Sequence, residues 1–122
     1  LDFLPGTVAA GGGMPVFRVD AAAFPLSIPV AGRLAQTAAG IELAIRPEHV
    51  QLGAQGIAAT VRLVQPVGPS TFVTVAWPGG ELVARLPGMV QFAPGEAVHF
   101  GIDDEAHMMF FDGEQGRHLP TG

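Results

Sequence analysis

The sequence predicts an all-β protein that contains, at most, one short turn of helix. Two observations support this class. From Gly56 onward, apolar and polar residues alternate with a period of two in one segment after another, which is typical of half-buried strands. Seventeen glycines and eleven prolines interrupt the chain too often for long helices and supply residues for many tight turns.

The first half of the chain has a looser pattern, in which glycine-rich and alanine-rich stretches separate the strand candidates. The segment "DAAAF" at 20–24 contains helix-forming alanines, but Pro25 and Pro29 follow at once and are expected to stop a helix. We expect one short helical turn there at most. The predicted strands of this half are 3–8, 14–19 and 41–46.

The second half has four predicted strands, and in three of them the apolar residues fall on one face. Aromatic and β-branched residues in "FVTVAW" favour a strand, and proline with glycine in "WPGGE" favours a tight hairpin. The strands are 57–63, 72–77, 81–86 and 97–102, and the turns are 78–80, 93–96 and 111–116. The residues expected to face inward are Ile57, Ala59, Val61 and Leu63, then Leu82, Ala84 and Leu86, then Val98, Phe100 and Ile102.

Strands joined by short turns in this way predict an antiparallel meander. Small all-β domains with this spacing of strands form sandwiches or barrels, and we expect an OB-fold-like antiparallel β-barrel, where OB denotes the oligonucleotide/oligosaccharide-binding type. A chain of 122 residues fits a single domain of this kind. Its first residue is Leu1 rather than methionine, so we expect the sequence to be a fragment of a longer protein.

The composition excludes several classes of function. Without cysteine the chain has no disulfide and no zinc–thiolate site, and without lysine it cannot contain the GxxxxGK[ST] loop of P-loop ATPases. A net charge of −5 argues against a nucleic-acid partner, because binding to phosphates depends on clustered cations. No apolar run approaches the roughly 18 residues of a membrane helix, so we expect no direct membrane insertion.

The densest polar segment is "IRPEHV" at 45–50, for which a catalytic or metal site, a ligand site and a structural latch are all considered. Glu48 and His49 are adjacent and would point to opposite faces of a strand, and no histidine pair has the HExxH spacing. No serine lies in a GxSxG elbow. We therefore expect no catalytic residue, no metal site and no cofactor in this chain. Phe72 and Trp77 are candidates for an aromatic ligand platform, with core packing expected for at least one.

Read in order, six motifs resemble one known family. They are "FLPGTV" at 3–8, "IELAIRPEHV" at 41–50, "VQPVGPSTFV" at 64–73, "ARLPG" at 84–88, "APGEAVHFGID" at 93–103 and "MFFDGEQGRHL" at 109–119. Together they are similar to the C-terminal regulatory region, the transport-associated OB (TOBE) domain, of ATP-binding subunits of ABC importers of the maltose and sn-glycerol-3-phosphate type. Ala44 and Met109 depart from the family's pattern.

The resemblance implies that residues 1–122 form a single regulatory TOBE/OB-like region, which is also related to MOP-type domains. The implied partners are the subunit's own N-terminal ATPase domain, a second copy of the subunit, the membrane permease through the ATPase domain, and a regulatory protein. ATP and Mg would bind in the missing N-terminal domain, and the complex would lie at the cytoplasmic face of the cell membrane. The residues implied at family motifs or interfaces are Arg46, Pro47, Glu48, Gly68, Pro69, Arg85, Phe111, Asp112 and Gly116.

Two functions remain open at this point, with a stand-alone enzyme ranked last. The first is a non-catalytic, dimer-supporting regulatory domain of the importer ATPase. The second is a sensor of a small oxyanion or sugar, for which "GPST" at 68–71 offers hydroxyl and amide groups. If the backbone stays extended, Arg46 and Glu48 project to the same face, and we expect Arg46 to contact the ATPase domain or the rim of the barrel.

Overall fold

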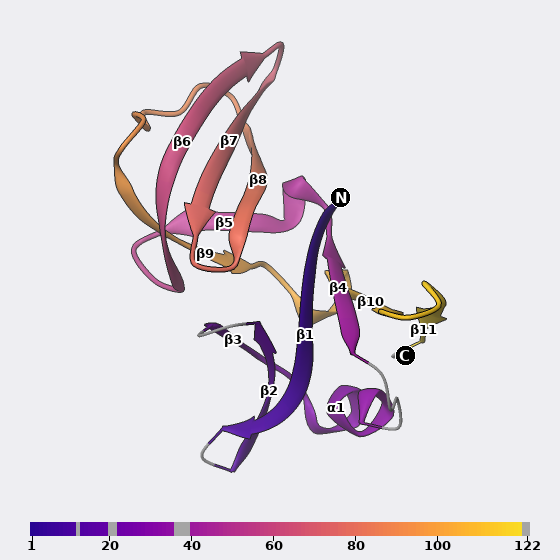
Figure 1. Cartoon of the computed structure of the whole chain (residues 1–122). Helices are drawn as coiled ribbons and strands as arrows, with labels where there is room; N and C mark the ends of the chain where they lie inside the picture. Colours follow the sequence, from indigo (N-terminus) through magenta and orange to yellow (C-terminus); the bar gives the residue numbers. More distant parts are fainter. Residues whose placement is uncertain (12, 20–21, 36–39, 121–122) are drawn as a thin grey trace. The chain divides into compact units, whose positions relative to one another are not determined.

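The structure is a computed structural model that describes residues 1–11, 13–19, 22–35 and 40–120. It forms two compact units. Unit 1 contains Leu1–Asp2 and Arg46–Asp104, and unit 2 contains Phe3–Ile45 and Glu105–Gly122. The elements labelled in Figure 1, in chain order, are β1 (Asp2–Gly11), β2 (Met14–Val19), β3 (Ala22–Pro25), α1 (Ile28–Leu34), β4 (Ile41–Ile45), β5 (Val50–Gly53), β6 (Ile57–Val67), β7 (Ser70–Trp77), β8 (Gly80–Pro87), β9 (Ala97–Ile102), β10 (Met109–Asp112) and β11 (His118–Leu119). Two short 3-10 helices, η1 (Pro47–His49) and η2 (Glu105–His107), are not labelled there.

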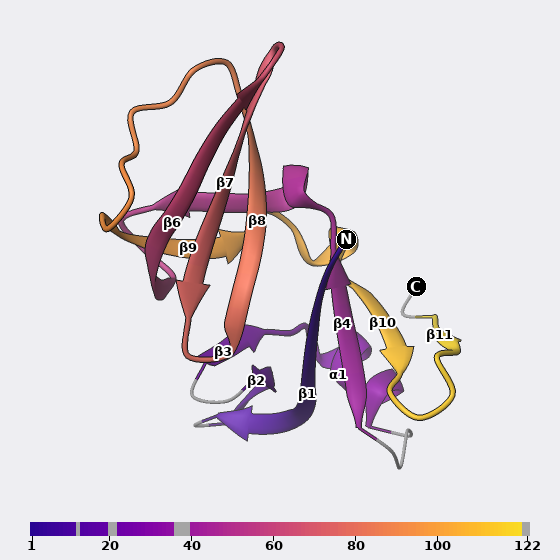
Figure 2. The same ribbon diagram turned by 45° about the horizontal axis from the view of Figure 1, so that its top comes forward.

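Unit 1 is built on one five-stranded sheet in the order β5-β9-β6-β7-β8, and every pair in it runs antiparallel. Figure 2 shows β6, β7 and β8 as three long neighbouring strands. These three strands form the predicted meander. The meander stops after β8, however, because β9 pairs with β6 on the opposite side of the sheet. The turn at 93–96 is held to β6 by hydrogen bonds from Val61 N to Glu96 O and from Gly95 N to Val61 O, so the chain returns to β6.

The all-β class and the OB-like architecture are confirmed, but the expected closed barrel is not formed. Strands β5 and β8 approach each other as the two edges of the sheet, yet no ladder joins them in the described part of the chain. Two features of β8 oppose a ladder there. The amide of Val83 already donates to Asp2 Oδ1 at 3.0 Å, and Pro87 has no N–H to donate.

The core of unit 1 lies on one face of this sheet. Val73 and Val75 are fully buried, and Trp77 packs edge-to-face on Phe100 with 5.4 Å between ring centroids. Each such side chain stabilises the fold by about 1.5–3 kcal/mol through removal of apolar surface from water. Among the predicted inward residues, the buried ones are Ala59, Val61, Leu82, Ala84, Val98 and Phe100, while Ile57, Leu86 and Ile102 are half-buried.

Leu63 is the predicted inward residue that the structure places outside. The register of β6 against β7 shifts between Val61 and Leu63, which pair with Val75 and Thr74. One extra residue in β6 reverses the alternation beyond it. Leu63 is therefore 47% exposed, although two-residue periodicity assigned it to the core.

Unit 2 contains a six-stranded sheet in the order β11-β10-β4-β1-β2-β3. The predicted strands at 3–8, 14–19 and 41–46 correspond to β1, β2 and β4. Its core includes Leu4, Leu43 and an edge-to-face pair of Phe17 with Phe110, whose ring centroids are 5.4 Å apart. Gly6 is required in β1 because a Cβ there would overlap the carbonyl oxygen of Arg18 on β2.

The helix of unit 2 lies outside the segment in which a helical turn was considered. Of "DAAAF", the described residues Ala22 to Phe24 belong to β3. Helix α1 instead begins after Ser27, whose Oγ accepts a hydrogen bond from Val30 N at 3.4 Å, and Pro29 lies in its first turn. Proline is favoured there because the first N–H groups of a helix have no partner within it. The expectation that Pro29 stops a helix was therefore wrong, and it helps to begin one.

Candidate functional site

The polar segment after β4 does not continue as a strand. Arg46 has extended dihedrals (φ −76°, ψ 141°), after which the chain turns into η1, closed by a hydrogen bond from His49 N to Arg46 O at 2.9 Å. Pro47 suits the first helical position because it has no N–H that would need a partner. The extended backbone on which Arg46 and Glu48 would share a face is thus not formed.

His49 makes a long-range side-chain contact from this segment. Its Nδ1 lies 3.0 Å from Asp103 Oδ2, and the amide of Asp103 donates to the carbonyl oxygen of His49 at 3.0 Å. The side chains are 23% and 28% exposed. Because Val50 pairs with Ile102 in the next register position, these bonds close the end of the β5–β9 ladder. The sequence gives no signal of this contact, since the two residues are 54 positions apart.

Arg46 and Glu48 are both exposed. Within the described part of the chain, the side chain of Arg46 makes no hydrogen bond to cap η1. Glu48 lines an open groove of about 650 Å³ whose walls come from the two edge strands β5 and β8 and which also includes Arg85 and Asp103. The groove therefore contains carboxylates and one guanidinium, and it lies between the edges of β5 and β8, which no ladder joins in the described part of the chain.

The motifs "GPST" and "ARLPG" meet at one end of unit 1. Gly68 forms the β6–β7 turn with φ +60°, and Pro69 O accepts from Gly88 N at 2.8 Å. The side chains use the same connection: Thr71 Oγ1 donates to Gly88 O at 2.7 Å, and Arg85 Nε donates to Ser70 Oγ at 3.2 Å. Thr71 is fully buried, so its hydroxyl serves the fold and does not face a ligand.

The remaining motif residues form a turn in unit 2. Asp112 Oδ1 accepts from the amides of Glu114 and Gln115 at 2.8 and 3.1 Å, and Asp112 O accepts from Gly116 N at 2.7 Å. Gly116 has φ +69°, a conformation that favours glycine. Phe111 packs edge-to-face on His118, with ring centroids 5.4 Å apart. The motif residues thus fall into two separate groups, one in each unit.

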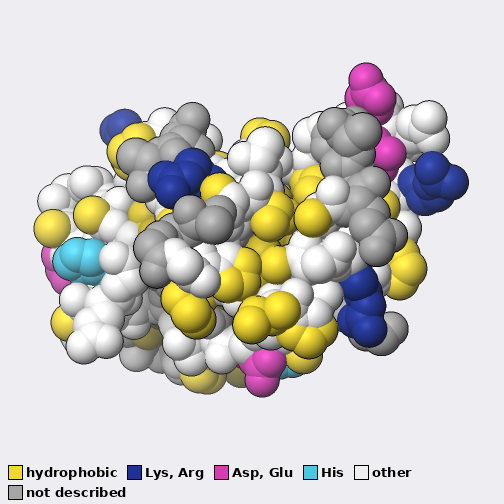
Figure 3. Space-filling model, turned by 90° about the horizontal axis from the view of Figure 1, so that it is seen from below, with side chains coloured by type: hydrophobic (Ala, Val, Ile, Leu, Met, Phe, Trp, Pro, Cys, Tyr) yellow, Lys and Arg dark blue, Asp and Glu magenta, His cyan; other side chains and the backbone are white. Residues whose placement is uncertain are grey.

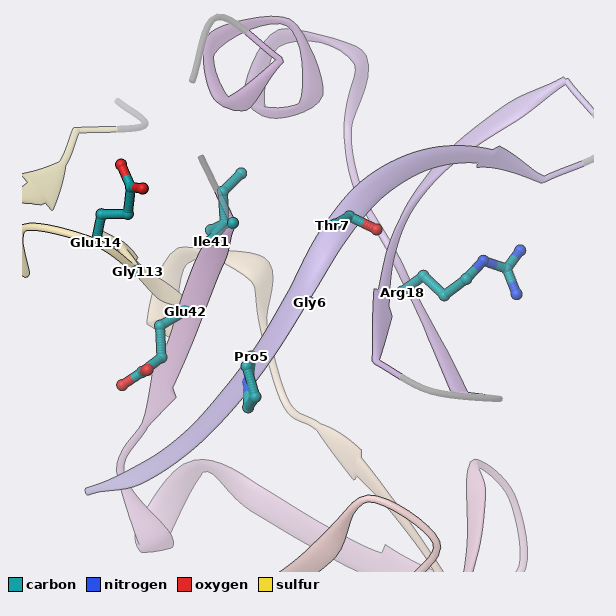
Figure 4. Close-up of a pocket in the computed structure, with 9 residues that line it drawn as sticks. Pro5, Gly6, Thr7, Arg18, Ile41, Glu42, Gly113 and Glu114 are labelled. Carbon is teal, nitrogen blue, oxygen red and sulfur yellow. The ribbon is translucent and has the colours of Figure 1, made fainter. Parts of the chain in front are cut away.

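Unit 2 also contains an open pocket of about 590 Å³ that sequence reasoning did not find. Thr7 contributes a hydroxyl, and Gly6 and Gly113 leave backbone exposed along the lining. In Figure 4 the side chain of Arg18 extends to the side opposite Glu42 and Glu114. No local signal marks this pocket, because its residues come from β1, β2, β4 and the turn after β10.

The aromatic platform considered for Phe72 and Trp77 is not formed in the described structure of β7. Phe72 and Trp77 have opposite parity along the strand, so their side chains lie on opposite faces. Trp77 is buried against Phe100, whereas Phe72 is half-buried on the other face. Trp77 is therefore a core residue, as expected for at least one of the two.

Charge is distributed without a dominant cluster on the face drawn in Figure 3, where arginine side chains of the described residues are separated by hydrophobic and uncharged ones. That no nucleic acid binds stays a prediction. Asp2 has a clear shift: burial raises the pKa of its carboxyl above 3.8, and the Val83 amide and the chain's amino group act against this rise. Asp2 Oδ2 is buried and has no hydrogen-bond partner among the described residues.

The TOBE domain family matches residues 43–110, more than half of the chain. The chain belongs to the TOBE domain family. The match extends from the middle of β4 to β10 and includes the whole of β5 to β9. It covers "IRPEHV", the turn at Gly68 and the strand that carries Arg85.

The relatives of this TOBE domain are ATP-binding proteins. The chain is 38% identical over 98 residues to the ABC transporter ATP-binding protein y4oS of Sinorhizobium fredii, which covers 80% of the chain and 26% of that protein. It is 31% identical over 118 residues to an ATP-binding protein of Brucella abortus (95% and 31% covered). It is 28% identical over 128 residues to the sn-glycerol-3-phosphate import ATP-binding protein UgpC of Yersinia enterocolitica (99% and 34%). The TOBE chain thus spans about a quarter to a third of these relatives.

A solved structure has the same fold. The cytoplasmic molybdate-binding protein ModG, determined with molybdate bound, superposes with a TM-score of 0.67 at 17% identity, covering 89% of this chain and 94% of that one. At this identity the likeness shows the fold alone. No described helix in this TOBE domain has the length and apolar character needed to span a membrane.

Proposed function

We propose that this chain is the non-catalytic, dimer-supporting regulatory domain of the ATP-binding subunit of an ABC importer, of the type that carries sugars or sn-glycerol 3-phosphate. The observation that carries the proposal is the TOBE match over residues 43–110, together with relatives that are ABC transporter ATP-binding proteins. The importer type has narrower support, from the 28% identity to UgpC.

In this role the chain binds no nucleotide itself. ATP and Mg bind in the ATPase domain of the same subunit, and that domain contacts the permease at the cytoplasmic face of the membrane. Arg46 and Glu48 are exposed at the entry to unit 1, directly after the match to the family begins at residue 43. They are therefore available to contact the ATPase domain, and a regulatory protein is a further partner of this surface.

The test compares the complete subunit with a version that lacks residues 1–122. We expect the shortened subunit to retain ATP hydrolysis but to form dimers more weakly and to lose regulation of solute uptake. Uptake of sn-glycerol 3-phosphate and of maltose in reconstituted transporters identifies the solute class. The proposal is contradicted if the shortened subunit dimerises and is regulated as before, or if the 122-residue chain hydrolyses ATP.

A sensor of a small ligand is the second candidate. The likeness of fold to ModG favours it, as does the open pocket in unit 2. One feature opposes an oxyanion in this pocket: Glu42 and Glu114 place carboxylates in the lining. At "GPST" in unit 1, the Thr71 hydroxyl already donates to Gly88 O and so is not open to a ligand. Calorimetry with molybdate, sulfate, sn-glycerol 3-phosphate and maltose decides between the candidates, because a micromolar isotherm with any of them supports the sensor.

A further inference from the structure

The sheet of unit 1 has an outer face on the side opposite its core. It is formed where β6, β7 and β8 lie side by side, and cross-strand partners place its residues in four rows. Residues directly opposite in an antiparallel pair project to the same face. We call this surface the outer face, and its rows are Val67–Ser70–Pro87, Gln65–Phe72–Arg85, Leu63–Thr74–Val83 and Thr60–Ala76–Glu81.

The outer face carries several apolar side chains that are exposed or half-buried. Leu63 is 47% exposed and Val67 is 54% exposed, while Phe72 and Val83 are half-buried. Leu63 lies on this face because of the bulge in β6, which moves it away from the core. Exposed apolar side chains gathered on one face mark a surface for association.

The free edge of β8 does not suit an added strand. Val83 N donates outward to Asp2, so alternation places the N–H groups of Glu81 and Arg85 on the same edge, where Pro87 offers none. An incoming strand would find one donor occupied and one missing. Strand addition at the β8 edge is therefore disfavoured, which leaves the outer face as the surface considered for a partner.

We propose that the outer face binds the outer face of a second copy of this chain, with a two-fold axis crossing the strands at the Leu63–Thr74–Val83 row. This inference rests on the proposed dimer-supporting function and names the surface that performs it. The axis makes residues of that row meet their own copies, which brings Leu63 against Leu63 of the partner subunit. Self-complementary surfaces of this kind are typical of two-fold dimers.

The rows on either side of the axis become complementary. Arg85 lies one row above it and Glu81 one row below it on the same strand, so Arg85 faces Glu81 of the partner subunit, and this pair occurs twice. In the same way Phe72 faces the small Ala76 of the partner subunit. Opposite charges and a large residue against a small one fit a single alignment of the two faces.

The small area of this face limits the affinity of such a dimer. With the axis on the third row, three of the four rows meet rows of the partner subunit. Three strands about 4.8 Å apart and three rows about 6.8 Å apart give about 290 Å² per copy, little more than a third of the roughly 800 Å² that each partner buries in a standard interface. The outer face alone therefore gives a weak dimer, which other contacts in the complete subunit reinforce.

The experiment is a charge exchange followed by sedimentation of the 122-residue chain from about 10 µM to about 1 mM. Glu81→Arg creates two like-charge contacts, so we expect dimerisation at least about tenfold weaker than in the parent chain. Glu81→Arg combined with Arg85→Glu restores opposite charges and should recover most of the affinity. Leu63→Ser should weaken the dimer similarly. Met14→Ser, at a residue of unit 2 that is 65% exposed, should leave it unchanged.

Thermal unfolding of each variant separates loss of association from loss of folding. Glu81 is exposed, so Glu81→Arg should leave the stability of the fold unchanged. Arg85→Glu removes the hydrogen bond to Ser70 and should lower it. If the chain dimerises and neither Glu81→Arg nor Leu63→Ser weakens it, the outer face is not the interface, while the proposed function stands. If the parent chain stays monomeric throughout, this inference is overturned; the comparison of complete and shortened subunits still tests the regulatory role.

Discussion

His49 and Asp103 are joined twice, by a side-chain contact of 3.0 Å between Nδ1 and Oδ2 and by a backbone hydrogen bond of 3.0 Å from Asp103 N to His49 O. These bonds fix the end of the β5–β9 pair, where Val50 lies opposite Ile102. The polar segment that raised the question of an active site is thus a structural connection within unit 1. The histidine makes this connection, and the neighbouring arginine and glutamate remain exposed.

Replacing His49 tests this connection. His49→Ala removes the side-chain contact and is expected to lower the free energy of unfolding by about 0.5–1.5 kcal/mol, the net contribution of one hydrogen bond. His49→Asn keeps a donor near the position of Nδ1 and should recover part of the loss. Urea denaturation measures both, with Glu48→Ala as the control at an exposed neighbour, expected to change stability by less than about 0.5 kcal/mol. Equal effects of His49→Ala and Glu48→Ala on the free energy of unfolding would disprove this connection.

Asp2 is expected to make stability depend on pH. Burial raises its pKa in the folded state above 3.8, so the folded chain binds this proton more tightly than the unfolded chain does. The stabilisation is complete below the unfolded pKa and is lost as pH rises through the folded one. Asp2→Asn keeps an acceptor for Val83 N and does not titrate, so its stability relative to the parent should be higher at about pH 7 than at about pH 4.

Denaturation by urea at both pH values measures this difference. Glu48→Gln is the control, because it removes an exposed carboxyl of unit 1 that lies outside the outer face. A difference between Asp2→Asn and the parent that does not change with pH, or that changes in the opposite direction, would contradict the assignment.

Gly68 is predicted to be required for the β6–β7 turn. Its φ of +60° is in the left-handed region, so Gly68→Ala should destabilise unit 1 by about 1 kcal/mol, although no atom within 4 Å would meet the new Cβ. Gly68→Asn should lose less, because asparagine tolerates this conformation. Gly53→Ala is the control, because a Cβ at Gly53 also meets no atom within 4 Å but Gly53 has no positive φ. Thermal unfolding compares the three variants.

Arg46 is predicted to act between domains and not within this chain. It is exposed, and its side chain does not cap η1, so Arg46→Ala should change the stability of the 122-residue chain by less than about 0.5 kcal/mol. In the complete subunit the same change should reduce the coupling of ATP hydrolysis to transport severalfold. Unchanged dimerisation together with unchanged coupling would discard the idea that Arg46 contacts the ATPase domain.

The sequence by itself determined the seven strands of five or more residues, which are β1, β2, β4, β6, β7, β8 and β9, and for three of them it determined which side faces the core. It missed the short strands β3, β5, β10 and β11, which are too brief for an alternating pattern to mark them. Leu82 and Ala84 are buried and Val98 and Phe100 are buried, as alternation predicted. Such predictions succeed because a strand's two faces follow from the two-residue repeat of its own backbone. The order of motifs likewise identified the family without the structure.

Only the tertiary structure decided features that depend on pairing between distant segments. The bulge that exposes Leu63 arises from the register of β6 on β7, and β9 joins β6 because the turn before it is bonded to Val61. The contact of His49 with Asp103 and the open edge next to Val83 have the same origin. A local pattern contains no information on which strand lies beside it, so the rows of the outer face, and the pairing of charges proposed for them, follow from the fold alone.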